Sequence, residues 1–265
     1  MAMAYETLLL EVGEDGVATL TLNRPEAMNA ITQRMKEELA AALDAVAADE
    51  RARVLLLTGA GGKAFCAGAD IKERSGQDPT PAEFVFRQQA THRLFTRIEQ
   101  FAKPVLCAIN GVAFGGGAEI ALCADIRLMA DTASIGLTEV NLGVIPAGGG
   151  TQRLPRLVGT AKAKELIFTA ARLQAGEALA IGLVNRVVPA ADLMAAARDL
   201  ARTIASKPPL AVRLAKQAID KGGQADLQTA LGFELYAAAI LFDTEDRKEG
   251  MRAFVEKRAP QFRGR

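Results

Sequence analysis

The sequence contains no tryptophan, two tyrosines and a single histidine, His92, among its 265 residues. Catalysis by a Ser-His-Asp triad and metal sites built from several histidines have almost no support, because both require imidazole groups that the chain lacks. His92 lies in the middle of a predicted helix, so we interpret it as a structural residue at or near the surface. Aromatic residues make up only 5% of the chain, so Leu, Val, Ile and Ala must form the core.

Cysteine is also scarce. Cys66, Cys107 and Cys123 are scattered and odd in number, a pattern that predicts neither a disulfide framework nor a zinc site with paired spacing. This usage is typical of a reducing compartment, and the first residues resemble neither a signal peptide nor a transit peptide. We therefore expect a cytoplasmic protein without a metal site. The longest apolar runs, such as 54–57 and 105–109, are far shorter than the roughly 20 residues that cross a bilayer, so no membrane partner is expected.

No excess of positive charge is available to attract nucleic acid. Lysine and arginine total 32 against 31 for aspartate and glutamate, which gives a net charge of +1. The basic residues form no run interleaved with aromatic residues, and residues 49–53 carry as many acids as bases. Nucleic acid is therefore not an expected partner. With 50% hydrophobic and 24% charged residues, the composition is that of an ordinary soluble globular protein.

The first 190 residues alternate between predicted strands and predicted helices. Alternating apolar and threonine residues at 17–22, preceded by 7–12 across a glycine-bounded turn, predict a β-hairpin. Thr32 is placed to cap a helix, whose apolar face consists of Met35, Leu39, Ala42, Leu43 and Val46. Further strands are predicted at 53–58, 104–109, 126–130 and 133–137, and further helices at 81–100, 115–123, 150–158 and 161–170. This order predicts an α/β fold in which helices cover a sheet.

The last part of the chain shows a different pattern. Residues 192–206, 210–221, 227–242 and 245–257 all have helical periodicity without intervening strands. We therefore predict two units, an α/β core at residues 1–190 and a helical subdomain at residues 191–265. The length is compatible with both, since single domains usually contain roughly 100–200 residues.

A glycine-rich segment at residues 58–64 invites comparison with nucleotide-binding loops. A dinucleotide-binding fingerprint would require glycine at position 64, and a phosphate-binding P-loop would require serine or threonine there. Ala64 occupies that position. The segment is therefore interpreted as an ordinary turn.

Two glutamates differ from the rest, most of which belong to solvated helix faces. Glu119 follows the glycines at 115–117, and no other charged residue occurs from 111 to 124. If these glycines open a helix, Glu119 lies near its first turn, where the helix dipole favours an ionised carboxylate. Glu139 follows a predicted short strand and precedes the glycine-rich segment at 143–150. The residues alone leave each glutamate equally compatible with a functional role and with capping or packing.

Three motifs occur in order along the chain, at residues 63–73, 110–119 and 138–154. They resemble the motifs of the crotonase family, and shorter matches at 23–30, 182–184 and 245–250 extend the likeness nearly from end to end. The resemblance implies a crotonase-type ββα spiral core with a C-terminal helical trimerisation subdomain. It also implies a homotrimer, or a hexamer built as a dimer of trimers.

Within this family the chain resembles the enoyl-CoA hydratases, which add water across the double bond of a 2-enoyl-CoA to give a 3-hydroxyacyl-CoA. The resemblance assigns the backbone N–H groups of Ala69 and Gly116 to an oxyanion hole for the thioester carbonyl. It assigns Glu119 to the activation of water and Glu139 to proton donation at Cα. Family members that only shift a double bond commonly lose the first of these acids, so the presence of both favours hydration by a hydro-lyase.

The expected substrate is an acyl-CoA thioester, and coenzyme A enters only as part of it, so no separate cofactor is expected. By resemblance, the residues that contact the CoA moiety are Ala64, Ala67, Asp70, Ile71, Lys72, Phe254 and Lys257. Phe254 and Lys257 resemble residues through which a neighbouring subunit reaches the CoA moiety. Lys72 is suited to meet a phosphate or ribose oxygen as a point charge, and a plain surface role remains equally open.

Substrate choice stays open at this point, because one methylene group changes discrimination by only about 1–3 kcal/mol. A straight-chain enoyl-CoA of fatty acid β-oxidation is one substrate. Residues 65–74, 163–168 and 256–260 also resemble the methylglutaconyl-CoA hydratases of leucine breakdown. Some members of that branch are described as RNA-binding, which leaves an RNA-binding protein or a non-catalytic scaffold on this fold as alternatives of another class.

Overall fold

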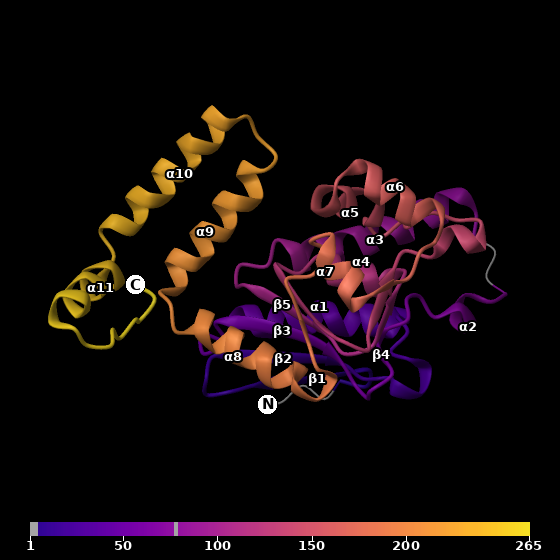
Figure 1. The fold of residues 1–265 in the computed structure, drawn as a ribbon, viewed down its shortest axis with the longest axis horizontal. Helices are drawn as coiled ribbons and strands as arrows, with labels where there is room; N and C mark the ends of the chain where they lie inside the picture. Colours follow the sequence, from indigo (N-terminus) through magenta and orange to yellow (C-terminus); the bar gives the residue numbers. More distant parts are fainter. Residues whose placement is uncertain (1–4, 77–78) are drawn as a thin grey trace.

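The computed structural model describes residues 5–76 and 79–265, which form two β-sheets (Figure 1). The larger sheet has six strands in the order β1-β2-β3-β5-β7-β10. These strands are β1 (Leu8–Val12), β2 (Val17–Leu22), β3 (Val54–Gly59), β5 (Val105–Ile109), β7 (Ile126–Ala130) and β10 (Arg186–Val188). The predicted hairpin is confirmed, because β1 and β2 pair antiparallel with Leu10 opposite Leu20. All other neighbours in this sheet run parallel and need crossover connections, which helices supply.

A smaller sheet has four strands in the order β4-β6-β8-β9. Its strands are β4 (Ala64–Cys66), β6 (Val112–Phe114), β8 (Ser134–Gly136) and β9 (Leu173–Gln174). β4, β6 and β8 each follow a strand of the larger sheet directly, so the chain repeats a unit of two strands and a helix. The predicted strand at 133–137 is confirmed as β8, but it belongs to this second sheet. The sequence does not reveal the second sheet, because strands of two or three residues are too short to show a periodicity.

Most helices lie where the sequence predicts them. The helices of the core are α1 (Gln33–Ala48), α2 (Ile71–Arg74), α3 (Pro81–Glu99), α4 (Gly116–Leu122), α5 (Gly150–Val158), α6 (Thr160–Phe168), α7 (Ala175–Ala180) and α8 (Leu193–Ala205), with 3₁₀ turns at η1 (Pro25–Ala27), η2 (Glu139–Leu142) and η3 (Ala190–Asp192). Thr32 caps α1 as predicted, because its hydroxyl accepts a hydrogen bond from the Met35 N–H at 3.1 Å. The predicted apolar face of α1 is buried.

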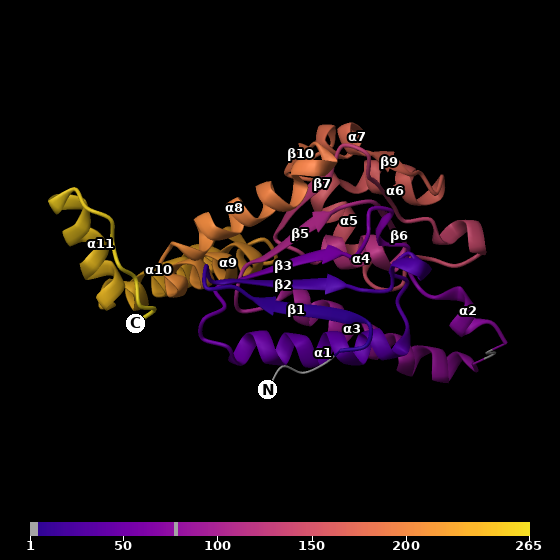
Figure 2. The same cartoon turned by 90° about the horizontal axis from the view of Figure 1, so that it is seen from below.

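The larger sheet lies at the centre of the hydrophobic core. Every residue of β3 and β5 is buried, and both strands are nearly continuous apolar runs in the sequence. Figure 2 shows α1 on one side of strands β1, β2 and β3, and α8 on the other. Helices on both faces therefore keep this mostly parallel sheet away from water.

α8 belongs to the core by its contacts, although it lies in the part of the sequence that has no strands. Its buried residues Leu193, Ala197, Ala201 and Ala205 recur every four positions, which places them on one face of the helix. The helix packs against β2, β3, β5 and β7. The division into units at residue 190 stays a prediction, and residues 1–4 of its first unit lie outside the described residues.

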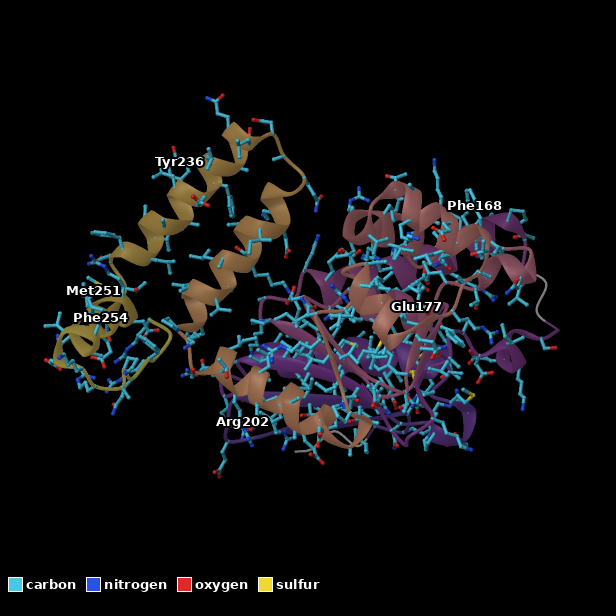
Figure 3. The ribbon with its side chains drawn as sticks, viewed as in Figure 1. Phe168, Glu177, Arg202, Tyr236, Met251 and Phe254 are labelled. Atoms are coloured by element: carbon cyan, nitrogen blue, oxygen red, sulfur yellow. The ribbon has the colours of Figure 1, made fainter. Side chains whose placement is uncertain are left out.

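The remaining helices leave the core. α9 (Pro209–Gly222), α10 (Leu227–Phe242) and α11 (Glu245–Glu256) confirm the predicted helical stretches, and Figure 1 shows them extending away from the sheets. Both views place α11 farthest from the sheets (Figures 1 and 2). We call these three helices the C-terminal arm. Figure 3 places Tyr236 on α10, and Met251 and Phe254 on α11, well away from the sheets. α10 packs along α9, yet the only residue of α10 that is buried in the described structure is Ala237.

Candidate active site

The first and second motifs meet at the N-terminus of α4. Ala69 lies in the turn between β4 and α2, and Gly116 is the first residue of α4. A Cβ atom built on Gly116 would lie 3.8 Å from the Ala69 nitrogen. The structure therefore brings together the two residues that are predicted to form an oxyanion hole.

The N–H groups of these two residues are not used by the fold. Ile31 forms a single β-bridge with Ala69: its N–H donates to the Gly68 carbonyl at 2.8 Å, and its carbonyl accepts the Asp70 N–H at 3.0 Å. The N–H of Ala69 itself therefore points away from Ile31. Gly116 opens a helix, where the first N–H groups have no intrahelical acceptor. Within residues 5–76 and 79–265, neither N–H donates to another group. Both remain available to a ligand.

The close approach of α4 to β4 depends on glycine. A Cβ atom on Gly117 would collide with the carbonyl oxygen of Cys66. Gly115, which precedes the helix, has a φ of 51°, a left-handed value that costs glycine little. The glycines therefore let the start of α4 lie directly against the turn that carries Ala69.

Glu119 lies in the first turns of α4 and points into the protein, where it is 4% exposed. Its Oε1 accepts a hydrogen bond from the Gly150 N–H at 2.9 Å. A Cβ atom on Gly148 would collide with its Oε2, so the carboxylate packs directly against the backbone of the glycines at 148–150. Burial raises the pKa of Glu119 above its ordinary value, and the Gly150 and Gly148 N–H groups oppose this shift.

The loop against Glu119, residues 147–150, is held from α3. Gln88 Nε2 donates to the Ala147 carbonyl at 2.7 Å, and His92 Nε2 contacts the same oxygen. The prediction that His92 is a surface residue of a helix is confirmed, since it is exposed on α3. Its contact places it one loop away from Glu119.

Arg153 holds the same loop from the other side. Its Nη1 donates to the Gly148 carbonyl at 3.1 Å, and its Nη2 forms an ion pair with Glu99 Oε2 at 2.8 Å. Sequence reasoning does not single out Arg153 or Gln88. Both bind the loop through its backbone carbonyls, which leave no signal in the sequence.

Glu139 is the first residue of η2 and is half-buried. Its Oε2 is buried and has no hydrogen-bond partner among the described residues. Its Oε1 lies beside the turn that opens α4, because a Cβ atom on Gly115 would be 3.3 Å from it. Burial, and then the negative charge of Glu119, raises the pKa of Glu139 to about 7.

The two carboxyl groups therefore both lie near the start of α4, in different surroundings. Glu119 is held by backbone N–H groups, which stabilise an ionised carboxylate. Glu139 has a buried oxygen without a partner, which favours the neutral acid. Such a pair can supply a base and an acid at one place.

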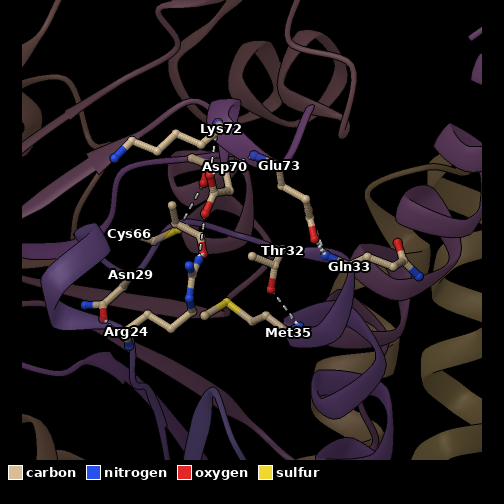
Figure 4. Close-up of polar contacts among 11 residues, drawn as sticks. Arg24, Asn29, Thr32, Gln33, Met35, Cys66, Asp70, Lys72 and Glu73 are labelled. Carbon is tan, nitrogen blue, oxygen red and sulfur yellow. Dashed lines mark hydrogen bonds and ion pairs between the residues drawn. The ribbon is translucent and has the colours of Figure 1, made fainter. Parts of the chain in front are cut away.

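The residues predicted to contact the CoA moiety fall into two groups. Ala64, Ala67, Asp70, Ile71 and Lys72 lie on or beside β4 and α2. Ile71 and Lys72 are exposed, and Figure 4 shows the Lys72 side chain extending away from Asp70. The carboxylate of Asp70 is engaged, because Oδ1 accepts the N–H groups of Lys72 and Glu73 at 3.0 and 3.2 Å.

The second group is not near the first within one chain. Phe254 lies on α11 and is 84% exposed, and Lys257 is the residue that ends this helix. Both views place α11 far from α2 and α4 (Figures 1 and 2). A single chain therefore does not bring Phe254 or Lys257 to the glutamates.

Other kinds of site have little structural basis in the described ranges. No group of three or more His, Cys, Asp or Glu residues there could hold a metal ion. Cys66, Cys107 and Cys123 are buried and free, and burial raises the pKa of Cys66 to about 12. No helix in this part of the chain is long and apolar enough to cross a membrane.

The fold and the site together define an α/β protein that presents two carboxyl groups and two backbone N–H groups where its strand-strand-helix units meet. A family model described as enoyl-CoA hydratase/isomerase matches residues 13–265. The chain belongs to this family. The family and the crotonase-type fold predicted from the sequence are thereby confirmed.

Individual relatives are similar along nearly the whole chain. The short-chain-enoyl-CoA hydratase of Clostridium acetobutylicum is 46% identical over 257 residues, which cover 97% of this chain and 97% of that protein. The crotonyl-CoA hydratase of Syntrophomonas wolfei is 46% identical over 261 residues, which cover 98% and 99%. The crystal structure of an enoyl-CoA hydratase from Bacillus anthracis has a TM-score of 0.95 at 44% identity and covers 98% of this chain and 100% of that one.

Proposed function

We propose that the protein is a hydro-lyase that adds water to 2-enoyl-CoA thioesters to give 3-hydroxyacyl-CoA products. The observation that carries this proposal is the pair of Glu119 and Glu139 at the start of α4, one held by a backbone N–H and the other with a pKa raised to about 7. Hydration needs a base for water and an acid for Cα, so two carboxyls with different preferred protonation states suit it. The names of the relatives support the same reaction.

In this proposal the thioester carbonyl binds between Ala69 and Gly116. When water attacks Cβ, the electrons of the double bond move toward the carbonyl and leave negative charge on its oxygen. The two N–H groups stabilise that charge, and the positive end of the α4 dipole adds to the effect. Losing one donor of this kind costs about 3–4 kcal/mol of transition-state stabilisation.

The two glutamates then balance the protons. Ionised Glu119 takes a proton from the attacking water, while protonated Glu139 gives its proton to Cα and the enolate electron pair forms the new C–H bond. The cycle leaves Glu119 protonated and Glu139 ionised, and exchange of one proton with solvent restores the starting state. The structural difference between the two carboxyls supports this division of roles, because Glu139 has a buried oxygen without a partner in the described structure, whereas Glu119 accepts a backbone N–H.

The CoA moiety is proposed to follow the β4–α2 segment, with Ala64, Ala67, Ile71 and Lys72 as its contacts. Phe254 and Lys257 would then come from the arm of a neighbouring copy, since they lie far from the site of their own chain. The exposed apolar surface of α10 supports a homotrimer, or two trimers forming a hexamer, in which other copies cover that surface. We propose that coenzyme A takes part only as a portion of the substrate.

The first test follows the loss of conjugated enoyl-thioester absorbance with crotonyl-CoA as the substrate. The relatives named as short-chain and crotonyl-CoA hydratases make this short, straight acyl chain the first choice. Wild-type protein is expected to turn over, and Glu119→Gln is expected to lose about a hundredfold or more in kcat. In deuterated water, Glu139→Gln is expected to form the Cα–D bond of the product at a rate that falls together with the rate of turnover.

A matched control is Glu14→Gln, which removes an exposed carboxyl in the β1–β2 turn and should leave kcat unchanged. Wild-type protein that does not act on crotonyl-CoA, but does act on methylglutaconyl-CoA, would correct the substrate and keep the reaction. Inactivity on both, with an intact fold, would reject the hydratase proposal.

A further inference from the structure

The turn that carries Ala69 is fastened to residues 24–31 on both sides of Ala69. Ile31 N–H donates to the Gly68 carbonyl at 2.8 Å, and the Asp70 N–H donates to the Ile31 carbonyl at 3.0 Å. These bonds use the backbone groups next to Ala69 and leave its own N–H unbonded within the described residues. The direction of the Ala69 N–H therefore depends on where residues 24–31 lie.

Residues 24–31 adopt an unusual backbone that side chains hold in place. Met28 and Asn29 have φ values of 52° and 55°, in the left-handed region that residues other than glycine seldom adopt. Asn29 is fully buried, and its Nδ2 donates to the Ala60 and Ala64 carbonyls at 3.0 and 2.8 Å. Its Oδ1 accepts the Arg24 N–H at 2.9 Å. The segment is thus fixed against the core, and Arg24 lies at its start.

Arg24 joins this fixed segment to the turn (Figure 4). Its Nη1 donates to the Ala30 carbonyl at 2.7 Å and to Asp70 Oδ2 at 2.9 Å. The other oxygen of Asp70 accepts the N–H groups of Lys72 and Glu73. The side chains of Arg24 and Asp70 are 22% and 12% exposed, so the ion pair is largely shielded from water and salt. The Arg24 guanidinium beside Asp70 lowers the pKa of that carboxyl.

We propose that Arg24 and Asp70 are positioning residues that hold the Ala69 N–H toward the thioester oxygen. This inference rests on the proposed hydratase function. Asp70 directly follows Ala69, so its side chain fixes the turn within one residue of the N–H in question. Donors to a developing oxyanion must be held in place before the reaction, because a misplacement of about 1 Å can cost roughly a hundredfold in rate.

A direct contact between Asp70 and the CoA moiety is the competing role, and the geometry disfavours it. Both carboxylate oxygens of Asp70 already have donors, one from Arg24 and the other from α2. A carboxylate near the phosphates of CoA would also repel them. The two roles predict different kinetics, because loss of a ground-state contact raises KM, whereas loss of a transition-state contact lowers kcat.

The experiment compares Asp70→Asn, Arg24→Gln and Arg24→Lys on crotonyl-CoA. Asn keeps the ability to cap α2 and removes the charge that meets Arg24. We expect kcat to fall about 10- to 100-fold in Asp70→Asn and Arg24→Gln, with KM within about twofold of wild type. Arg24→Lys, which keeps the charge, should retain more activity than Arg24→Gln. The double variant Arg24→Gln with Asp70→Asn should be no slower than the slower single variant, because the pair acts as one unit.

Arg202→Gln serves as the matched control. Arg202 forms an ion pair of similar length, 2.8 Å, with Asp15 in the β1–β2 turn, far from Ala69 in the sequence and more exposed than the Arg24–Asp70 pair. It should show a change in thermal stability no larger than that of the Arg24 variants and no change in kcat. A general loosening of the fold would lower kcat in the control as well.

A second measurement uses an enoyl-CoA that carries an electron-donating aromatic group at Cβ, whose absorbance shifts to longer wavelength when its carbonyl is polarised. Wild-type protein should produce this shift, and Asp70→Asn and Arg24→Gln should bind the compound with a smaller shift. An unchanged shift and kcat in both variants would overturn the proposal, and so would an increase in KM alone, which would assign Asp70 to CoA. Because the shift requires no turnover, it tests the positioning role even if wild-type protein does not hydrate crotonyl-CoA.

Discussion

α8 and α10 lie close together in the sequence, but α8 is packed against the core and α10 is mostly exposed. α8 buries four residues on one face against the larger sheet, whereas α10 buries Ala237 alone in the described structure. Yet α10 is the more apolar helix, and its exposed large residues are Leu227, Leu231, Leu235, Tyr236, Ile240 and Phe242. The core is therefore stabilised by contacts within one chain, whereas the arm displays apolar surface that one chain leaves uncovered.

This difference separates two sources of stability. Exposed apolar surface that is continuous along a helix usually marks an interaction site, because soluble monomers rarely display large patches of it. Substitutions in the core should act on the unfolding of each chain. Substitutions on α10 should act on association between chains, and their effect should depend on protein concentration.

The largest effect is expected from charge placed on α10. In the proposed homotrimer or hexamer, where other copies cover α10, the double variant Leu231→Glu with Leu235→Glu should leave single chains, because each buried unpaired charge costs several kcal/mol. Light scattering after size-exclusion chromatography measures the mass directly. Gln228→Glu adds a charge to an exposed polar position of the same helix and should leave the mass unchanged. An unchanged mass in the double variant would show that α10 is not the surface that joins the copies.

A smaller effect is expected from the same truncation in the two regions. Leu56→Ala, in β3 where the side chain is fully buried, should lower the free energy of unfolding by about 2–5 kcal/mol at every protein concentration. Leu235→Ala removes the same atoms from α10 and should lower it only where the copies associate. Urea unfolding at several concentrations measures both. If both variants lost the same free energy of unfolding at every protein concentration, α10 would be stabilised within one chain, as the core is.

The smallest effect concerns pH and lies in the core. The pKa of Glu139 is raised from an ordinary 4.5 to about 7, so the folded protein holds a proton that the unfolded chain releases between these values. Folding stability contributed by this group should therefore fall as pH rises from about 4.5 to 7 and stay level above that. Glu139→Gln should remove this trend, whereas Glu14→Gln should keep it.

The same protonation should appear in the kinetics. Because neutral Glu139 is the proposed proton donor, kcat/KM of wild-type protein should decline as pH rises above about 7. A profile that stays flat well above pH 7 would remove Glu139 from the role of acid.

The sequence predicts well those elements that depend on residues close together in the chain. The hairpin, the Thr32 cap of α1 and the long helices follow from turn residues, a capping side chain and periodicity. The sequence does not reveal the division into two sheets, because pairing between β4, β6 and β8 joins residues far apart in the chain. It also cannot show that α10 lacks cover, since periodicity gives the apolar face of a helix and not its partner.

The candidate site divides in the same way. Glu119 and Glu139 stand out in the sequence through their glycine-rich neighbours and through the resemblance to a family, and their roles remain proposals. Asp70 stands out too, but its engagement with Arg24, 46 residues away, is visible only in the structure. Gln88 and Arg153 leave no signal, because side chains that bind distant backbone carbonyls follow no local pattern.

The contact between Gly117 and Cys66 limits how this protein can change over generations. Every single-base change in a glycine codon that gives another amino acid adds at least a Cβ atom to the residue. At position 117 this Cβ atom would already collide with the Cys66 carbonyl oxygen. No small step away from glycine is neutral at this position, whereas exposed positions without a proposed contact, such as Glu14 and Glu50, can vary freely in shape. Drift in descendants of this gene should therefore be slow at the start of α4 and fast at such exposed turns.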